Sequence, residues 1–258
     1  MRLYDNARTV ANEHELLAEF QRSSLAAYQH CTHIADIQYG THPRSTLDLF
    51  PLEQAQKTVI FIHGGYWQWC DKSDFGFIVP YVLAKGAQCV LLEYDLAPQS
   101  RISDIVSQVN QALDFIREQD WRTDEMVLVG HSAGAHLTAL SLGHPLISEM
   151  VLLSGIYDLR PIQSTHLNYA LNLSSEDILK YSPIHHSDRV TIPCSIFCGE
   201  LELEELKWQS QNYFDIKKEQ DQYFVSFKLI PKINHYSILE HYFKSILSLS
   251  SRITIYAM

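Results

Sequence analysis

The chain has 258 residues, of which 46% are hydrophobic and 19% are charged. This length and composition allow a large buried core and exclude a mainly disordered chain. The formal net charge is −10 and no Lys/Arg-rich run occurs, so we expect neither nucleic acid nor an anionic membrane surface as a partner.

The amino-terminal residues 1–17 contain no apolar stretch of the kind found in signal peptides. The longest apolar runs are far shorter than the roughly 20 residues of a membrane-spanning helix. Five cysteines without a framework pattern are typical of reduced thiols in a cytoplasmic protein. Because no repeat, linker or low-complexity tract divides the chain, we expect a cytoplasmic protein with one domain, residues 1–258.

Hydrophobic spacing predicts a helix over 13–29 and then two strands, near 33–39 and 46–50. Farther along the chain, short apolar runs alternate with helical patterns. The runs predict strands at 58–62, 88–94, 126–130, 150–155, 195–199 and 224–230, and the patterns predict helices at 73–85, 103–118, from 132, near 203–219 and near 236–248. This alternation indicates an α/β protein with a mostly parallel sheet covered on both faces. The two early strands have no helix between them, so we expect them at an antiparallel edge.

Two segments do not follow this alternation. Residues 156–190 carry prolines and polar clusters, and the pattern supports a cap or lid over the sheet as well as a surface loop without a role. Residues 250–258 are compatible with either an edge strand or a tail.

Residues 130–134 read Gly-His-Ser-Ala-Gly, a G-x-S-x-G pattern between an apolar strand and an alanine-rich helix. A sharp turn there would hold Ser132 in a strained backbone conformation, with its hydroxyl at the carboxyl edge of the sheet. The helix N-terminus would direct free N–H groups toward a developing anion. We therefore interpret Ser132 as a nucleophile rather than as an ordinary helix-capping serine.

Residues 63–67 read His-Gly-Gly-Tyr-Trp directly after a predicted strand. Glycines at such a position let backbone N–H groups approach a ligand closely. A tetrahedral intermediate needs such donors for its oxyanion. We expect them to be the N–H of Ala133 and one or both of the N–H groups of Gly64 and Gly65. His63 is interpreted as a brace for the loop.

A serine hydroxyl needs a general base, which should follow both the nucleophile and the acid in the chain. His235 lies between the last apolar strand and the last helix, at the same sheet edge as Ser132. His241 lies inside that helix and is interpreted as structural, while His185 and His186 precede the acid region. The predicted base is therefore His235.

The acid should follow the strand at 195–199, where residues 199–205 offer four glutamates and no aspartate. One carboxylate would hold the tautomer of the imidazole and stabilise the imidazolium. The others are typical of solvated acids at a helix start. From the residues alone, Glu200, Glu202 and Glu204 remain alternatives.

These motifs resemble the kynurenine formamidase (arylformamidase) branch of the α/β-hydrolases. GHSAG is common among esterases, whereas HGGYW together with SGIYDLRP is more specific to this branch. The matching stretches span about 200 residues and read YGTHPRSTLDLFP (39–51), HGGYWQ (63–68), EYDLAPQ (93–99), GHSAGAHL (130–137), SGIYDLRPI (154–162), YSPI (181–184), EELKWQSQNY (204–213) and NHYSILE (234–240).

The resemblance implies an α/β-hydrolase fold with Ser132 as nucleophile and His235 as base. The acid of the family lies three residues after the glycine that ends its strand. That glycine is Gly199 here, so the resemblance implies Glu202 as the acid.

Gly65 and Ala133 match the oxyanion donors of the family, and Tyr66 and Trp67 would then shape the pocket beside the scissile group. Such an aromatic wall suits an aryl substrate. The chain departs from the family where Leu206 and Trp208 replace a usual Phe and Arg, which weakens the inference about the substrate and not the inference of a hydrolase.

The function that this resemblance implies is hydrolysis of aryl formamides such as N-formyl-kynurenine, to formate and the free amine through a formyl-enzyme, as in tryptophan catabolism. The main alternative is a small-acyl carboxylesterase with the same triad, and a third is a non-catalytic ligand-binding member of the fold. We expect a small-molecule substrate and no metal or cofactor. The tyrosine-rich segments are compatible with a homodimer.

Overall fold

The computed structural model describes residues 4–220 and 224–247. Its centre is an eight-stranded sheet with the order β1-β2-β4-β3-β5-β6-β7-β8. The strands are β1 (Ile34–Gln38), β2 (Thr46–Phe50), β3 (Lys57–Ile62), β4 (Gln88–Leu92), β5 (Glu125–His131), β6 (Glu149–Leu153), β7 (Cys194–Gly199) and β8 (Val225–Ile230). The strands from β3 to β8 run parallel, whereas β1 and β2 pair antiparallel. The predicted parallel sheet with an antiparallel edge is confirmed.

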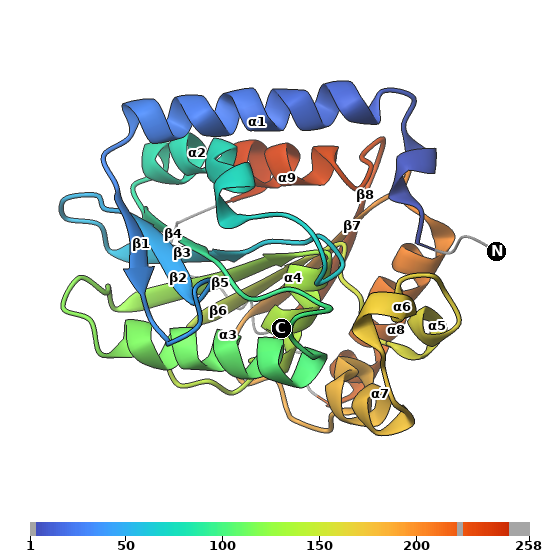
Figure 1. The fold of residues 1–258 in the computed structure, drawn as a ribbon. Helices are drawn as coiled ribbons and strands as arrows, with labels where there is room; N and C mark the ends of the chain where they lie inside the picture. The colour runs from blue at the N-terminus through green and yellow to red at the C-terminus, as the bar shows by residue number, and fades with distance from the viewer. Residues whose placement is uncertain (1–3, 221–223, 248–258) are drawn as a thin grey trace, which may run out of the picture.

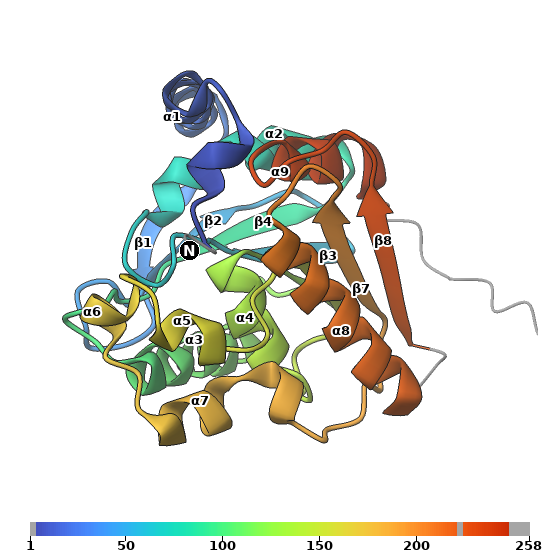
Figure 2. The ribbon, with the colours of Figure 1, turned by 90° about the vertical axis from the view of Figure 1, so that its right-hand side faces the viewer.

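Helices cover both faces of the sheet (Figures 1 and 2). One face carries α1 (Glu13–His30), the 3₁₀ helix η2 (Lys72–Ile78), α2 (Val79–Ala84), α9 (Ser237–His241) and the π-helical turn η4 (Tyr242–Ile246). The other face carries α3 (Ile102–Arg117), α4 (Ala133–Leu140) and α8 (Glu204–Gln220). Among the helices described, none is long and apolar enough to cross a membrane. The cytoplasmic location stays a prediction.

The core lies in two layers because successive side chains of a strand point to opposite faces. In β3, Ile60 and Ile62 pack in the layer that contains α3 and α4, while Val59 and Phe61 pack in the layer that contains α2 and α9. All six residues of β3 are buried. This explains why residues 59–62 of the strand are continuously apolar rather than alternating.

Several elements differ from their predicted bounds, among them the following three. The helix predicted over 73–85 divides into a 3₁₀ segment, which begins after the capping residue Asp71, and a short α-helix with a proline in its first turn. The strand predicted to reach residue 155 ends at Leu153, because Ser154 has a φ of 54° and leaves the extended conformation. The last helix is short and continues as a π-helical turn.

The segment 156–190 forms short helices: α5 (Arg160–Gln163), α6 (Asn168–Leu171), α7 (Ser175–Tyr181) and the 3₁₀ turn η3 (Pro183–His185) (Figures 1 and 2). Of these, α7 contacts α3, and η3 contacts α4 and α8. The Ser174 side chain caps α7 in a capping box with Asp177. The cap role of this segment stays a prediction. The edge strand or tail considered for 250–258 lies outside the described residues.

Candidate active site

Ser132 occupies a sharp corner between β5 and α4, with a φ of 57° and a ψ of −119°. Such a conformation costs a non-glycine residue about 1–3 kcal/mol, so the surroundings must enforce it. The N–H of Ser132 donates to the carbonyl oxygen of Leu153 at 2.8 Å. A Cβ at Gly134 would lie 2.0 Å from the Ile62 carbonyl oxygen, and one at Gly130 would lie 2.3 Å from the Gly134 carbonyl oxygen. Both glycines are therefore required for α4 to pack this closely on the sheet.

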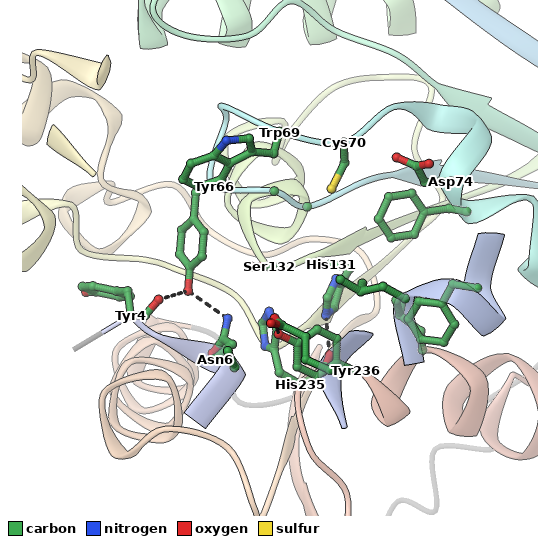
Figure 3. A pocket seen from close by; sticks show the side chains of 18 of the residues that line it. Tyr4, Asn6, Tyr66, Trp69, Cys70, Asp74, His131, Ser132, His235 and Tyr236 are labelled. Carbon is green, nitrogen blue, oxygen red and sulfur yellow. Dashed lines mark hydrogen bonds between the residues drawn. The ribbon is translucent and has the colours of Figure 1, made fainter. Parts of the chain in front are cut away.

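Ser132 and His235 line the same cavity, which has a volume of about 920 Å³ (Figure 3). The two residues come from different parts of the chain, the β5–α4 corner and the loop after β8, and both corners lie at the carboxyl ends of parallel strands. Ser132 and His235 are almost fully buried, at 2% and 5% exposure. The histidines weighed as alternatives, His185, His186 and His241, do not line this cavity.

Glu202 holds the ring of His235. Its Oε2 lies 2.8 Å from His235 Nδ1, and its Oε1 accepts hydrogen bonds from the Ser154 hydroxyl and the Gly199 N–H, both at 2.6 Å. An ionised carboxylate only accepts, so Nδ1 carries the proton and Nε2 is the acceptor that a general base requires. The chain therefore contains the Glu202–His235 pair that the resemblance implied, with Nε2 of the ring left as an acceptor.

The other two candidate acids are directed elsewhere. Glu200 accepts from the Lys232 N–H at 3.0 Å, and the 91% exposed Glu204 side chain pairs with Lys207. Glu202 alone among these three is buried against His235, and it is the position that the resemblance implied.

Backbone N–H groups lie free beside Ser132. Among the described residues, none accepts a hydrogen bond from the N–H of Gly65 or Ala133. Ala133 is the first residue of α4, so its N–H has no partner within the helix. Gly64 and Gly65 line the cavity, and a Cβ at Gly64 would lie only 3.0 Å from Ser132 Cβ. The arrangement can offer two or three N–H donors to an anion at Ser132.

We expect the substitution Gly65→Ala to lower kcat by on the order of 10² or more, because it disturbs this donor loop. Gly65 has a φ of +101°, and a Cβ there would lie 2.1 Å from the Trp69 carbonyl oxygen. Steady-state kinetics beside a thermal unfolding scan would test this. As a control, Gly86→Ala changes a positive-φ glycine with no atom within 4 Å of the added Cβ and should leave kcat unchanged. Equal kcat for Gly65→Ala and the native protein would contradict the role of the loop.

A buried network fixes the donor loop. His63 Nε2 lies 2.9 Å from Glu93 Oε1, and the His63 ring stacks on Tyr94 at 4.3 Å. Glu93 also pairs with Arg44 at 2.7 Å and accepts from the Lys72 N–H at 2.8 Å. The bracing role expected of His63 thus has a physical basis. Sequence reasoning missed Glu93 as its anchor, although a carboxylate directly after a continuously apolar strand was a usable signal.

Tyr66 lines the cavity, as expected. Its hydroxyl donates to the Tyr4 carbonyl oxygen at 2.9 Å and accepts from Asn6 Nδ2 at 2.8 Å (Figure 3).

For Trp67 the structure corrects the expectation that its side chain shapes the pocket. Its side chain is fully buried and packs edge-on against His136 at 4.9 Å, away from the cavity wall. The wall is formed instead by Trp69, because the tight turn at Gly65 reverses the chain between the two tryptophans.

His131 is a second histidine that sequence reasoning did not assign. Its Nε2 donates to the backbone carbonyl of His235 at 3.0 Å, and the two rings lie 4.6 Å apart. Burial, reinforced by the nearby His235, holds the pKa of His131 well below its ordinary value. His131 is therefore neutral and supports the loop that carries His235. Its place next to Ser132 in the G-x-S-x-G motif was the available signal.

Comparisons with known proteins identify the family of the chain. A family model described as BD-FAE matches residues 47–144. Kynurenine formamidase of Danio rerio is 31% identical over 80% of this chain and 76% of its own length, and kynurenine formamidase of Drosophila melanogaster is 29% identical over 79% and 75%.

Among solved structures, a proposed thioesterase from Silicibacter sp. TM1040 superimposes with a TM-score of 0.87 at 24% identity, over 96% of this chain and 95% of that one. An esterase from Pyrobaculum calidifontis gives 0.69 at 15% identity, over 93% and 90%. These structures confirm the predicted α/β-hydrolase fold. With a relative above 30% identity over most of both chains, this hydrolase belongs to the kynurenine formamidase family.

Proposed function

We propose that the protein is a serine hydrolase that cleaves aryl formamides of the N-formyl-kynurenine type. The observation that carries the proposal is the His235 ring, held at Nδ1 by the buried Glu202 carboxylate at 2.8 Å and lining one cavity with Ser132. This constellation converts an ordinary hydroxyl into a nucleophile. The formamidases of fish and fly at about 30% identity support the choice of substrate.

In the proposed reaction, Ser132 Oγ attacks the formyl carbon while His235 Nε2 takes the hydroxyl proton. The oxyanion accepts hydrogen bonds from the N–H groups of Gly65 and Ala133. His235 then gives its proton to the nitrogen of the departing arylamine, and the C–N bond breaks. Water, deprotonated by His235, attacks the formyl ester and releases formate from Ser132.

The cavity wall supports an aryl leaving group. Four aromatic side chains line the same cavity as Ser132: Tyr66, Trp69, Phe75 and Tyr236. Planar rings bury much apolar surface against such walls and stack in offset or edge-on geometries.

A small-acyl carboxylesterase is the second candidate, and it would use the same residues. Two observations favour it: the cavity volume of about 920 Å³ exceeds the needs of a formyl group, and a probable isoprenylcysteine methylesterase of Oryza sativa is 31% identical over 44% of this chain. The two functions differ in the acyl group and in the leaving atom, and not in the catalytic machinery.

The test is a comparison of kcat/KM for N-formyl-kynurenine, p-nitrophenyl acetate and p-nitrophenyl butyrate. We expect the formamide to be the preferred substrate once each value is divided by the rate of uncatalysed hydrolysis. Rapid cleavage of both esters with negligible release of formate would overturn the formamidase proposal and leave the esterase.

A further inference from the structure

The amino-terminal region forms part of the wall of the cavity that contains Ser132. Residues 4–7, which we call the amino-terminal strap, all line it. The segment 156–190, which the sequence suggested as a cap, contributes only His166 and Leu167 to the described lining. More of this wall thus comes from the strap than from the expected cap.

The Tyr66 hydroxyl holds the strap from the side of the glycine loop. It donates to the Tyr4 carbonyl oxygen at 2.9 Å and accepts from Asn6 Nδ2 at 2.8 Å (Figure 3). The carbonyl oxygen can only accept, so the single proton of the hydroxyl is committed to it. Burial raises the pKa of Tyr66 above its ordinary value, so the phenol stays neutral. Tyr66 therefore holds the strap, and its proton is not free for a substrate.

The Tyr4 side chain holds the strap from the side of α8. It is 4% exposed, and its hydroxyl donates to Glu205 Oε1 at 3.3 Å and accepts from Gln209 Nε2 at 2.8 Å. Glu205 and Gln209 lie one helical turn apart on the same face of α8. Gln209 is itself fixed, because its Oε1 accepts from two backbone N–H groups at 2.7 and 2.8 Å. The stretch 204–213, which carried part of the resemblance, thus contains the two residues that grip Tyr4.

These contacts fix the strap from two sides, the glycine loop and α8. The rings of Tyr4 and Tyr66 also meet edge-on, with their centroids 6.2 Å apart. Neither hydroxyl has Ser132, Glu202 or His235 among its hydrogen-bond partners. Removal of one hydroxyl therefore loosens the strap without removing a hydrogen bond of these three residues.

The wall of the cavity limits the space available to a substrate, because Ser132 is only 2% exposed and lines this cavity. A group bound beside Ser132 must fit within the wall of which the strap is part. Extra bulk against a fixed, close-packed wall costs free energy, whereas a wall that can move outward accommodates the bulk. The contacts that fix the strap therefore bear on the size of the substrate.

We propose that the amino-terminal strap determines how large a substrate the cavity accepts, and that Tyr4 and Tyr66 set its position. The inference rests on the proposed function, because it assigns a specificity determinant to that same site. Glu205 and Gln209 become positioning residues, which act through Tyr4, since neither of them lines the cavity.

The test compares substrates of two sizes. One pair varies the acyl group and consists of p-nitrophenyl acetate and p-nitrophenyl octanoate. The second pair varies the leaving group and consists of phenyl acetate and para-phenylphenyl acetate. In each pair, kcat/KM for the larger ester is divided by kcat/KM for the smaller one, so that a loss of activity common to both substrates cancels.

Tyr66→Phe and Tyr4→Phe should each raise this ratio by about 5-fold or more in the same one of the two pairs. Tyr66→Phe takes a partner from the Tyr4 carbonyl oxygen and from Asn6 Nδ2, and the strap moves toward water to satisfy them. The matched control is Tyr81→Phe, because the Tyr81 hydroxyl donates to Glu240 and Tyr81 does not line the cavity. Its ratios should equal those of the native protein. Native ratios in both pairs for Tyr66→Phe and Tyr4→Phe would overturn the proposal.

Added bulk in the strap should have the opposite effect. Ala7 is partly exposed and lines the cavity, so Ala7→Phe should lower the ratio by about 10-fold in that same pair. Ala11→Phe is the control, at an exposed position that does not line the cavity, and it should keep the native ratio. Thermal midpoints would verify the folding of every variant. If both tyrosine variants are unfolded, a native ratio in Ala7→Phe overturns the proposal by itself.

Failure of the proposed function and failure of this inference give different results. Ester hydrolysis with the native size ratios in every variant would keep the hydrolase and remove the inference. If the native protein hydrolyses none of these esters, formate release from N-formyl-kynurenine decides on the proposed function, and calorimetry with aniline and para-aminobiphenyl decides on the strap. Tyr66→Phe should then shift the ratio of the two dissociation constants by about 5-fold or more in favour of the larger amine. An equal ratio in the variant and the native protein would overturn the inference.

Discussion

Replacement of Ser132 by alanine is expected to lower kcat/KM by a factor on the order of 10⁴ or more for formamide and ester alike. The reason is that both reactions would pass through a covalent ester on this hydroxyl. Without it, the variant keeps only substrate binding and the stabilisation that the N–H donors give to the transition state. Steady-state kinetics would measure the loss. Reaction with a fluorophosphonate, followed by mass spectrometry of the intact chain, should add one adduct to the native protein and none to Ser132→Ala.

The matched control is Ser154→Ala. Ser154 is also a buried serine with a positive φ, and its hydroxyl donates to Glu202 and not to a substrate. This variant should keep the fluorophosphonate adduct and lose far less activity than Ser132→Ala. A native-like kcat in Ser132→Ala, or a failure of the native protein to react with the probe, would contradict the serine mechanism and favour a non-catalytic member of the fold.

Glu202→Gln should lower kcat by on the order of 10³–10⁴ while the protein stays folded. The Ser154 hydroxyl and the Gly199 N–H both donate to Oε1, so they would hold the oxygen of the new amide in that place. The amide nitrogen would then face His235 Nδ1 and donate to it. That arrangement moves the ring proton to Nε2, where it prevents His235 from accepting the proton of the nucleophile.

Two neighbouring glutamates provide controls within the same loop. Glu200→Gln and Glu204→Gln remove the same charge from exposed positions and should change kcat by less than about 3-fold. Kinetics of the three variants, with thermal midpoints to verify folding, would compare them. A loss of activity in Glu200→Gln or Glu204→Gln that equals the loss in Glu202→Gln would show that the acid has been misassigned.

Most of the fold could be predicted from local patterns, because strands buried on both faces must be continuously apolar and the helices that cover them must carry an apolar stripe. The stripe predicted for residues 103–118 is an example. In α3, its members Ile105, Val109, Ala112, Leu113 and Ile116 are all buried. The residues at which strands and helices begin and end were less predictable. Ser154, which follows the end of β6, donates a hydrogen bond to Glu202. The two residues lie 48 positions apart, so no local sequence pattern records this contact.

In the candidate site, too, local sequence patterns predicted some features, and long-range contacts determined the others. The sequence by itself determined the serine motif, the glycine loop and the position of His235, since each depends on residue types next to a strand end. Only the tertiary structure shows which of Glu200, Glu202 and Glu204 is buried against the imidazole, because that depends on how the loop after β7 packs on the loop after β8.

Only the structure shows that Trp69 and not Trp67 lines the cavity beside Ser132. It also shows that Tyr4, Asn6 and Glu13 from the amino-terminal region line this cavity. These residues lie more than a hundred positions from Ser132, and they reach it because α1 packs across η2, with Phe20 stacked on Phe77 at 4.3 Å. Motifs encode chemistry near one point of the chain. The composition of a cavity wall depends on long-range packing, which is decided only when the whole chain folds.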